Sequence, residues 1–232
     1  MTLNQVVHRY MGRVPEVRTY CSRCIATERW DGSVVLMVVD AAFTSIGLNY
    51  FLAVVPKVME FEEHYVKTNR IKTLEELASA NVEELRKVWK NRRSWQVAKE
   101  LASYLATLKK EKSISERATL RLWAKNAASE NWHRDPIGRI NGVGINTFQY
   151  LRMMGGVDTV MPDKIVKRVI NQILIEAGKE PVEEDLAFIK TVHKIATNTG
   201  YKAIELCWMT WLVQSEGDKI RIEKYAKVLP KI

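Results

Sequence analysis

Helical periodicity runs through almost the whole chain after residue 33, and it restricts the fold more than any other feature. In residues 73–90, TLEELASANVEELRKVWK, apolar side chains recur at steps of three and four, and Thr73 followed by Glu76 forms a capping box. Residues 94–110 repeat the pattern and end in lysines, which the helix dipole favours. No alternating pattern is long enough for a sheet, although residues 17–24 are compatible with a short extended piece. We therefore predict an all-α fold.

The composition indicates a folded protein with a basic surface. With 232 residues and 47 % hydrophobic content, the chain can bury a core in one domain or in two closely joined lobes. Its longest apolar run, at 34–39, is far shorter than the roughly 20 residues of a membrane span, and its N-terminus lacks a signal-peptide core. We expect no membrane association and a cytoplasmic location, nucleoid-associated if the source is prokaryotic. The net charge of +9 favours an anionic partner.

The three cysteines predict reduced thiols rather than a cofactor site. Cys21 and Cys24 have a spacing that suits zinc or redox chemistry, but no second pair or histidine couple completes a tetrahedral site. Even with Cys207, the chain has too few cysteines for an iron–sulfur cluster held by four. We therefore expect no metal and no required cofactor.

The stretch INGVGINTF, residues 140–148, is the first that points to a specific function. Gly142 and Gly144 separate a short segment that starts near Pro136 from an apolar helical pattern, so helix, glycine turn and helix are expected here. Bare backbone N–H groups beside a helix start form a cradle for a phosphate. A plain αα-turn uses glycines only for their positive φ, and the spacing alone leaves both interpretations open.

Residues 140–170, INGVGINTFQYLRMMGGVDTVMPDKIVKRVI, resemble the helix-hairpin-helix (HhH-GPD) DNA glycosylases of the endonuclease III type. The hairpin of that family reads L-P-G-V-G-x-x-T, and an aspartate follows it some twenty residues later at the head of a helix. Residues 140–147 and Asp163 match these two features. Val166, Arg168 and Val169 match the family pattern D-x-x-I-x-R-V. The resemblance extends more loosely over about residues 34–215.

The resemblance implies two helical lobes within a single unit over residues 1–232, with the active site in the cleft between them. About residues 40–150 form one lobe, ending in the hairpin, and about 1–39 plus 160–232 form the second. It implies a monomer that removes a damaged or mispaired base from double-stranded DNA in base excision repair. The hairpin 141–145 would grip a phosphate, with a monovalent cation as a further expectation at its backbone. The implied DNA-binding residues are Asn141, Gly142, Val143, Gly144, Ile145, Asn146, Thr147, Lys164, Arg92 and Arg93.

Asp163 is the predicted catalytic carboxylate. Breaking an N-glycosidic bond builds positive charge on the sugar, and a fixed carboxylate near C1′ stabilises that charge or activates water. Aspartate is also a preferred N-cap, and the helical pattern KIVKRVINQILIEAG follows it, so a capping role is the alternative. One residue can serve both roles.

Asn146 stands where bifunctional members of the family carry the lysine that forms a Schiff base with the sugar. Because an amide nitrogen is not nucleophilic, we predict a monofunctional glycosylase without lyase activity by that route. Lys164, beside Asp163, is the alternative amine, although a lysine in a first helical turn more often faces solvent or a phosphate.

Asp40 is the second candidate catalytic residue. It follows the apolar run, and burial would raise its pKa so that a protonated carboxyl donates to a flipped base. The adenine-specific branch of the family has a glutamate in a comparable place, with a loose match to DAAFTSI. A helix-capping or buried, hydrogen-bonded structural carboxylate is the alternative. The turn beyond it would border the base pocket and supply the wedge that fills the gap in the duplex, with Thr44, Ser45, Ile46, Leu48 and Asn49 as candidates.

Two non-enzymatic functions compete with a glycosylase. One is a helix-hairpin-helix DNA-binding protein without catalysis. The other is a helical scaffold for protein partners, which would show no salt-dependent binding to DNA.

Overall fold

The computed structural model describes residues 1–45, 50–213, 229 and 232, and this part of the chain is mostly helical and contains no strand. The predicted all-α class is confirmed. The elements are α1 (Leu3–Met11), α2 (Val17–Ala26), the 3₁₀ helix η1 (Arg29–Gly32), α3 (Val34–Thr44), the π-helix η2 (Tyr50–Val54), α4 (Val55–Phe61), the π-helix η3 (Glu62–Val66), α5 (Leu74–Ser79), α6 (Val82–Leu85), α7 (Arg92–Lys112), α8 (Glu116–Asn126), the 3₁₀ helix η4 (Ser129–Arg134), α9 (Ile145–Met154), α10 (Lys164–Glu176), α11 (Asp185–Thr199) and α12 (Ala203–Val213).

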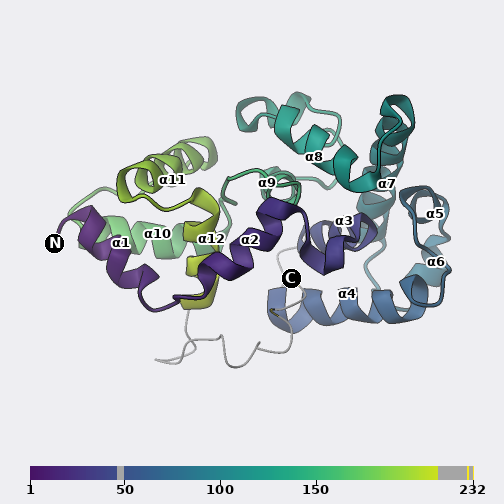
Figure 1. The fold of residues 1–232 in the computed structure, drawn as a ribbon, viewed down its shortest axis with the longest axis horizontal. Coiled ribbons are helices and arrows are strands. Elements are labelled where there is room, and N and C mark those ends of the chain that lie inside the picture. Colours follow the sequence, from purple (N-terminus) through teal and green to yellow (C-terminus); the bar gives the residue numbers. More distant parts are fainter. Residues whose placement is uncertain (46–49, 214–228, 230–231) are drawn as a thin grey trace.

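The first helices of the chain lie beside the last ones (Figure 1). Helix α1 packs against α10, α11 and α12, and α2 packs against α12 and α9. At the other end of the molecule, α3, α5 and α8 pack against α7, with α3 and α8 also touching α9. The division into two lobes stays a prediction, and its boundary at residues 39 and 40 would fall inside the continuous helix α3.

Helix α3 lies in the middle of the core. Ser33 caps it by accepting a hydrogen bond from the N–H of Leu36, and every residue from Val34 to Phe43 is buried. A helix that is apolar on all sides has to be surrounded by others, and α3 is flanked by α7 and α9. Asp40 is the one charged residue in α3, so it has to find its partner in the interior.

The glycine segment differs from the prediction on one side. In place of a helix over residues 135–140, there is a single turn, with the N–H of Arg139 donating to the carbonyl of Asp135 at 3.0 Å. Asp135 Oδ1 accepts the N–H of Ile137 at 2.9 Å, which is a turn geometry. Gly142 then has a φ of +106°, which ends any helical continuation. The helix after the glycines, α9, forms as predicted.

Residues 17–24 are helical and lie within α2, so the interpretation of this segment as a short extended piece is wrong. Val17, Cys21 and Cys24 recur at helical spacing on the buried face of α2, which packs against α12. The predicted capping box is confirmed at the start of α5: Thr73 accepts from the N–H of Glu76, and Glu76 accepts from the N–H of Thr73.

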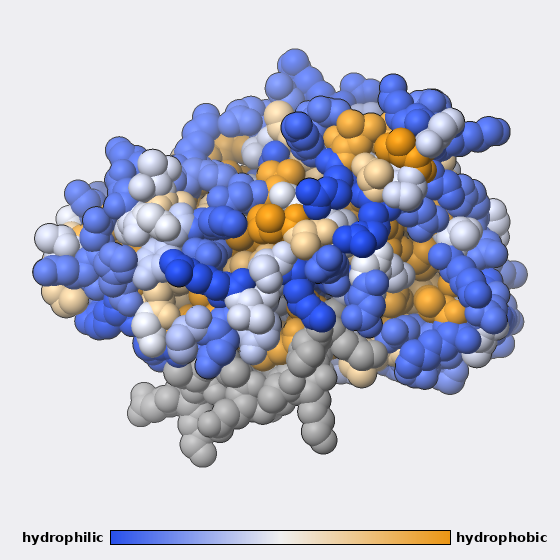
Figure 2. Space-filling model, in the orientation of Figure 1, coloured by the Kyte–Doolittle hydropathy of each residue, from blue (hydrophilic) through white to orange (hydrophobic). Residues whose placement is uncertain are grey.

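Hydrophilic residues cover most of the face in Figure 2, with apolar residues in separate patches between them. Within the described residues, no helix combines the length and the hydropathy needed to cross a membrane.

Candidate active site

Gly142 and Gly144 of the predicted hairpin differ in their backbone conformation and surroundings. At Gly142 the φ of +106° favours glycine, and a Cβ would lie 2.8 Å from Cγ2 of Val97 and 3.0 Å from Nε of Arg93. At Gly144 the backbone is extended, with φ −103° and ψ 176°, and a Cβ would meet no atom within 4 Å. The fold therefore requires a glycine at 142, whereas at 144 the glycine leaves open space beside the backbone.

The N-terminus of α9 borders this open space. Gly144 is its N-cap, and no side chain of the described residues caps it. Its first N–H groups are therefore available to an external acceptor such as a phosphate oxygen. The side chains of Val143, Ile145 and Thr147 are buried, so in this segment the backbone would make the contact.

Among the predicted DNA-binding side chains outside residues 141–147, Arg93 is the one that the structure places beside Gly142 in the described residues. Arg93 is exposed, lies in the first turn of α7 and packs against Gly142. Asn141, Arg92 and Lys164 are also exposed, and no interaction joins them to the hairpin within the described part of the chain. Asn146 is partly buried, and its Oδ1 is buried without a hydrogen-bond partner among the described residues.

Asp163 is the N-cap of α10, which confirms its predicted capping role. Oδ1 accepts hydrogen bonds from the N–H groups of Ile165 and Val166, each at 2.8 Å. Oδ2 accepts the indole N–H of Trp211, on α12, at 3.1 Å. Burial raises the pKa of Asp163 above its ordinary value, and the three hydrogen bonds together with the charge of Arg168 lower it in part.

Trp211 connects Asp163 to a cluster of aromatic rings. It stacks on Tyr50, with 5.8 Å between the ring centres and 21° between the planes, and it meets Tyr150 edge-on at 6.1 Å. Trp208, one turn earlier on α12, meets it edge-on at 5.5 Å. Tyr50 belongs to η2 and Tyr150 to α9, so three distant parts of the chain meet around this indole.

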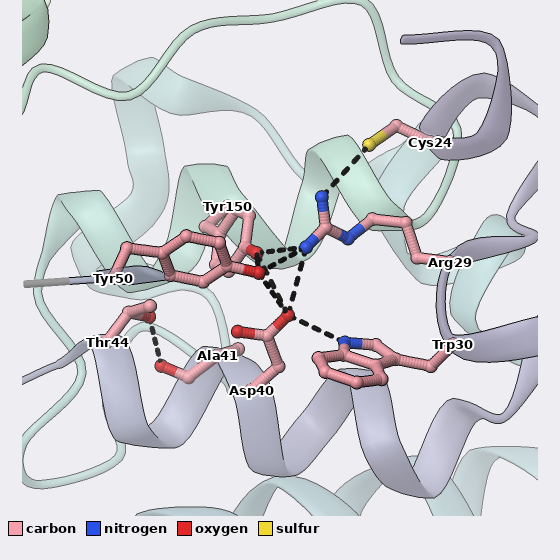
Figure 3. A network of polar contacts seen from close by, with 8 residues as sticks. All are labelled: Cys24, Arg29, Trp30, Asp40, Ala41, Thr44, Tyr50 and Tyr150. Atoms are coloured by element: carbon pink, nitrogen blue, oxygen red, sulfur yellow. Dashed lines mark hydrogen bonds and ion pairs between the residues drawn. The ribbon is translucent and has the colours of Figure 1, made fainter. Parts of the chain in front are cut away.

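Tyr50 and Tyr150 are in turn bound to a buried ion pair (Figure 3). Arg29 Nη2 and Asp40 Oδ2 lie 3.1 Å apart, with both side chains wholly buried. The same Oδ2 accepts the indole N–H of Trp30 at 2.8 Å and lies 3.0 Å from each tyrosine hydroxyl. Both hydroxyls accept from Arg29 Nη2. Burial raises the pKa of both tyrosines well above the usual range, so they stay protonated and donate to the carboxylate.

The short helix η1 brings two of these groups to Asp40 through an unusual backbone. Trp30 and Asp31 have positive φ values of 52° and 54°, which is uncommon for residues other than glycine and costs about 1–3 kcal/mol each. The Trp30 ring is buried and its N–H is bound to Asp40, so burial and hydrogen bonding offset that strain.

The geometry does not fit the prediction that Asp40 is a protonated acid facing a flipped base. Asp40 is fully buried, and its Oδ2 is bound by the guanidinium of Arg29 and three further donors, so it presents no exposed atom to a flipped base. The structural alternative, a buried and hydrogen-bonded carboxylate, describes Asp40 better. Its Oδ1 is buried and has no hydrogen-bond partner in the described residues.

Only two of the residues predicted to form the base pocket or wedge, Thr44 and Ser45, belong to the described residues. The Thr44 and Ser45 hydroxyls donate to the carbonyls of Ala41 and Ala42, at 2.7 and 2.6 Å, so they help to end α3. Ile46, Leu48 and Asn49 lie outside the described residues. The pocket and its wedge therefore stay predictions.

The sequence alone does not mark Arg29, Trp30 or Trp211 as part of this site. Helical periodicity assigns Trp211 to the core, and no local pattern marks the other two. One signal does exist: a lone carboxylate in an apolar helix needs a buried partner. The chain offers 36 lysines and arginines, so that signal predicts a partner without identifying it.

The three cysteines are free and buried. Burial raises the pKa of all three thiols, which disfavours the thiolate that ligates metals. Within the described residues, no group of three or more histidine, cysteine, aspartate or glutamate side chains could hold a metal ion.

A cavity of about 320 Å³ opens away from this site, between η3, α5 and α6. Arg70 pairs there with Glu84 at 3.8 Å, and Glu76 accepts from the N–H groups of Lys72 and Thr73. Its ionisable groups are thus occupied by local contacts, which does not favour it as a reaction site.

Residues 11–215 match the model of a family described as Domain of unknown function (DUF8548). No curated protein and no solved structure matches the chain.

Proposed function

Since the chain belongs to the DUF8548 family, whose description names no activity, we propose its function from its own residues. We propose a monofunctional DNA glycosylase that hydrolyses the N-glycosidic bond of a damaged or mispaired base in double-stranded DNA. It would act as a monomer in the cytoplasm or on the nucleoid, without a required cofactor. The monovalent cation at the hairpin backbone stays a prediction.

The arrangement of Asp163 carries this proposal. A carboxylate that only caps a helix needs no hydrogen bond beyond those to the backbone N–H groups of the first turn. Here Oδ1 makes the cap, while Oδ2 is held separately by the N–H of Trp211 in a partly buried setting. This second, tertiary contact fixes the orientation of the carboxylate, which a catalytic group needs.

The hairpin supplies the second line of support. Open space at Gly144, the uncapped start of α9 and the exposed Arg93 together suit one phosphate of a DNA backbone. Such a contact reads no sequence and positions the strand. The target nucleotide would then rotate out of the stack toward Asp163.

In the proposed reaction, Asp163 acts on the sugar of the flipped nucleotide. As the bond from C1′ to the base breaks, positive charge develops on the sugar, and the negative charge of Asp163 stabilises it. Water adds to C1′, with its proton accepted by the carboxylate or released to solvent, and the base departs. The products are a free base and an abasic site in an uncut strand.

The proposal is tested with oligonucleotide duplexes that carry uracil, thymine mispairs, 8-oxoguanine, hypoxanthine or alkylated purines. After incubation, alkali cleaves the strand wherever an abasic site has formed. Cleavage with any of these lesions supports the enzyme. Salt-dependent binding without cleavage on all of them would favour the alternative, a DNA-binding protein without catalysis, and no binding at all would favour a protein scaffold.

Strand cleavage without alkali is expected to be absent. Asn146 has no nucleophilic nitrogen to form a Schiff base, so borohydride should trap no covalent complex between the protein and an abasic duplex. The measurement is a denaturing gel of wild-type protein with labelled DNA and borohydride. If a cross-link forms, and Lys164→Gln abolishes it, then Lys164 serves as the amine and the protein has lyase activity.

A Gly144→Ala variant is expected to fold normally and to bind DNA roughly fivefold more weakly, because one phosphate contact of about 1 kcal/mol would be blocked. The backbone at residue 144 is extended and a Cβ there meets no atom, so the melting temperature should stay close to that of wild type.

Gly142→Ala is the contrasting variant for this prediction. Its positive φ and the contact with Val97 should lower the melting temperature. Fluorescence anisotropy with labelled duplex, measured over a series of salt concentrations, follows the DNA affinity. Unchanged affinity of a folded Gly144→Ala protein would show that the hairpin does not contact DNA through Gly144.

A further inference from the structure

The two carboxylate oxygens of Asp163 have different hydrogen-bond partners. Oδ1 is occupied by two backbone N–H groups of the first turn of α10, so the helix itself holds it. Oδ2 has one donor among the described residues, the indole N–H of Trp211 at 3.1 Å. Since Oδ1 is engaged twice, Oδ2 is the oxygen with lone-pair capacity left for an incoming sugar or water.

Trp211 is held on several sides by other rings. Tyr50 stacks on it, Tyr150 and Trp208 meet it edge-on, and its own side chain is buried. Such packing leaves the indole little freedom to rotate, so the direction of its N–H is set by these neighbours.

Two of those rings are tied to the buried ion pair. The hydroxyls of Tyr50 and Tyr150 each lie 3.0 Å from Asp40 Oδ2 and accept from Arg29, as Figure 3 shows. A tyrosine that shifts would leave a buried charge with fewer partners, which is costly. The ion pair therefore holds the tyrosines, and the tyrosines hold Trp211.

We propose that Trp211 is a positioning residue for Asp163, and that the buried Arg29–Asp40 pair keeps Trp211 in place through Tyr50 and Tyr150. The inference rests on the proposed function, because positioning matters only if Asp163 acts on a substrate. It assigns Asp40 a role in the site without any contact to the substrate.

The hydrogen bond from Trp211 has two effects on Asp163. It fixes the direction in which Oδ2 presents its free lone pair, and it favours the ionised carboxylate against the burial that raises the pKa. Loss of the N–H should therefore raise the pKa of Asp163 further. Activity that requires the carboxylate would then be lost at a higher pH as the solution is acidified.

The test compares Trp211→Phe with Trp89→Phe. Both variants replace a buried indole by a smaller ring, but Trp89 Nε1 has no hydrogen-bond partner among the described residues, and its ring stacks on Phe43 and does not contact Trp211. We expect Trp211→Phe to lower kcat about tenfold or more with little change in KM, since it removes a hydrogen bond to a charged group. The pH below which activity is lost should rise in Trp211→Phe and stay unchanged in Trp89→Phe.

A second measurement needs neither a variant that folds nor any enzymatic activity. In the wild-type full chain, the indole ¹H–¹⁵N resonance of Trp211 should titrate with the same midpoint as the ¹³C carboxyl resonance of Asp163. The resonance of Trp89, whose ring stacks on Phe43 outside this cluster, should not follow it. A Trp211 resonance that ignores the titration of Asp163 would overturn the positioning role.

The failures of the two proposals differ. If wild-type protein excises no base from any lesion, the proposed glycosylase is rejected, whatever the resonances show. If wild-type protein excises a base and Trp211→Phe keeps its kcat and its pH profile, the positioning role alone is rejected.

Discussion

Replacing Asp163 by asparagine is expected to slow base excision by about a hundredfold or more while the protein stays folded. Asparagine caps a helix about as well as aspartate, so its side-chain oxygen can still accept from Ile165 and Val166. It carries no negative charge, and losing one preorganised electrostatic group costs on the order of 10²–10³ in rate. Single-turnover excision from the lesion found active, with circular dichroism of the same sample, measures both quantities.

The matched control for this variant is Glu184→Gln. Glu184 also caps a helix with its carboxylate, accepting from the N–H groups of Leu186 and Ala187 at the exposed start of α11. Its replacement makes the same chemical change at a cap that is not among the hydrogen-bond partners of Asp163, so excision should continue at the wild-type rate.

The structure adds a second control. In Asp163→Asn, the amide NH₂ would face the indole N–H of Trp211, where two donors meet. Adding Trp211→Phe removes that conflict, and the double variant should recover stability but not activity. A folded Asp163→Asn protein that excises bases at the original rate would refute the catalytic assignment.

Removing one partner of the buried Arg29–Asp40 pair is expected to cost about 3–5 kcal/mol of unfolding free energy. Asp40→Leu leaves the Arg29 guanidinium buried, with the tyrosine hydroxyls and a thiol as its remaining acceptors among the described residues. Arg29→Met leaves a buried carboxylate with neutral donors. Both losses are large compared with the total free energy of unfolding of a typical domain, about 5–15 kcal/mol. Urea unfolding followed by tryptophan fluorescence measures them, with the slope of each transition checked for two-state behaviour.

The double variant Arg29→Met with Asp40→Leu shows whether the ion pair itself causes these losses. Replacing both charges by apolar groups removes the unpaired charge, so much of the stability lost in each single variant should return. Arg86→Met, which breaks the exposed pair with Glu83, serves as a surface control and should change stability little. Losses that simply add in the double variant would mean that the two charges are not coupled.

The same variants decide between the two interpretations of Asp40. If Asp40 donated a proton to the base, Asp40→Asn would stop the reaction while the protein kept most of its stability. If Asp40 holds the aromatic cluster, stability and the titration of Asp163 should change together.

Local structure was predictable wherever neighbouring residues determine it. The capping box of Thr73 and Glu76 and the N-cap at Asp163 form as expected, because each depends on side chains within three residues of the backbone they bind. The segment 135–140 differs because Asp135 binds its own local backbone and Gly142 stops the chain from continuing as a helix. Those contacts compete with a helix start that Pro136 favours.

The candidate functional residues were likewise predictable only where local sequence marks them. Spacing along the chain identified Gly142, Gly144, Asn146 and Asp163, and Asp40 was identified as the single charge after an apolar run. The meaning of Asp40 changes once its neighbours are known. Because Asp40 is bound by the guanidinium of Arg29, the indole of Trp30 and the two tyrosine hydroxyls, we interpret it as a structural residue and not as a proton donor to the base.

By itself the sequence determined the helical class, the caps, the bare turn at Gly142 and Gly144, and the absence of a nucleophilic amine at Asn146, because these follow from residue type and short-range spacing. The tertiary structure decided that Arg29 pairs with Asp40, that Tyr150 joins them across 121 and 110 residues, and that Trp211 binds Asp163 from 48 residues away. Helices meet by packing apolar faces whose periodicity does not identify the partner, so contacts of this length appear only when the chain is folded.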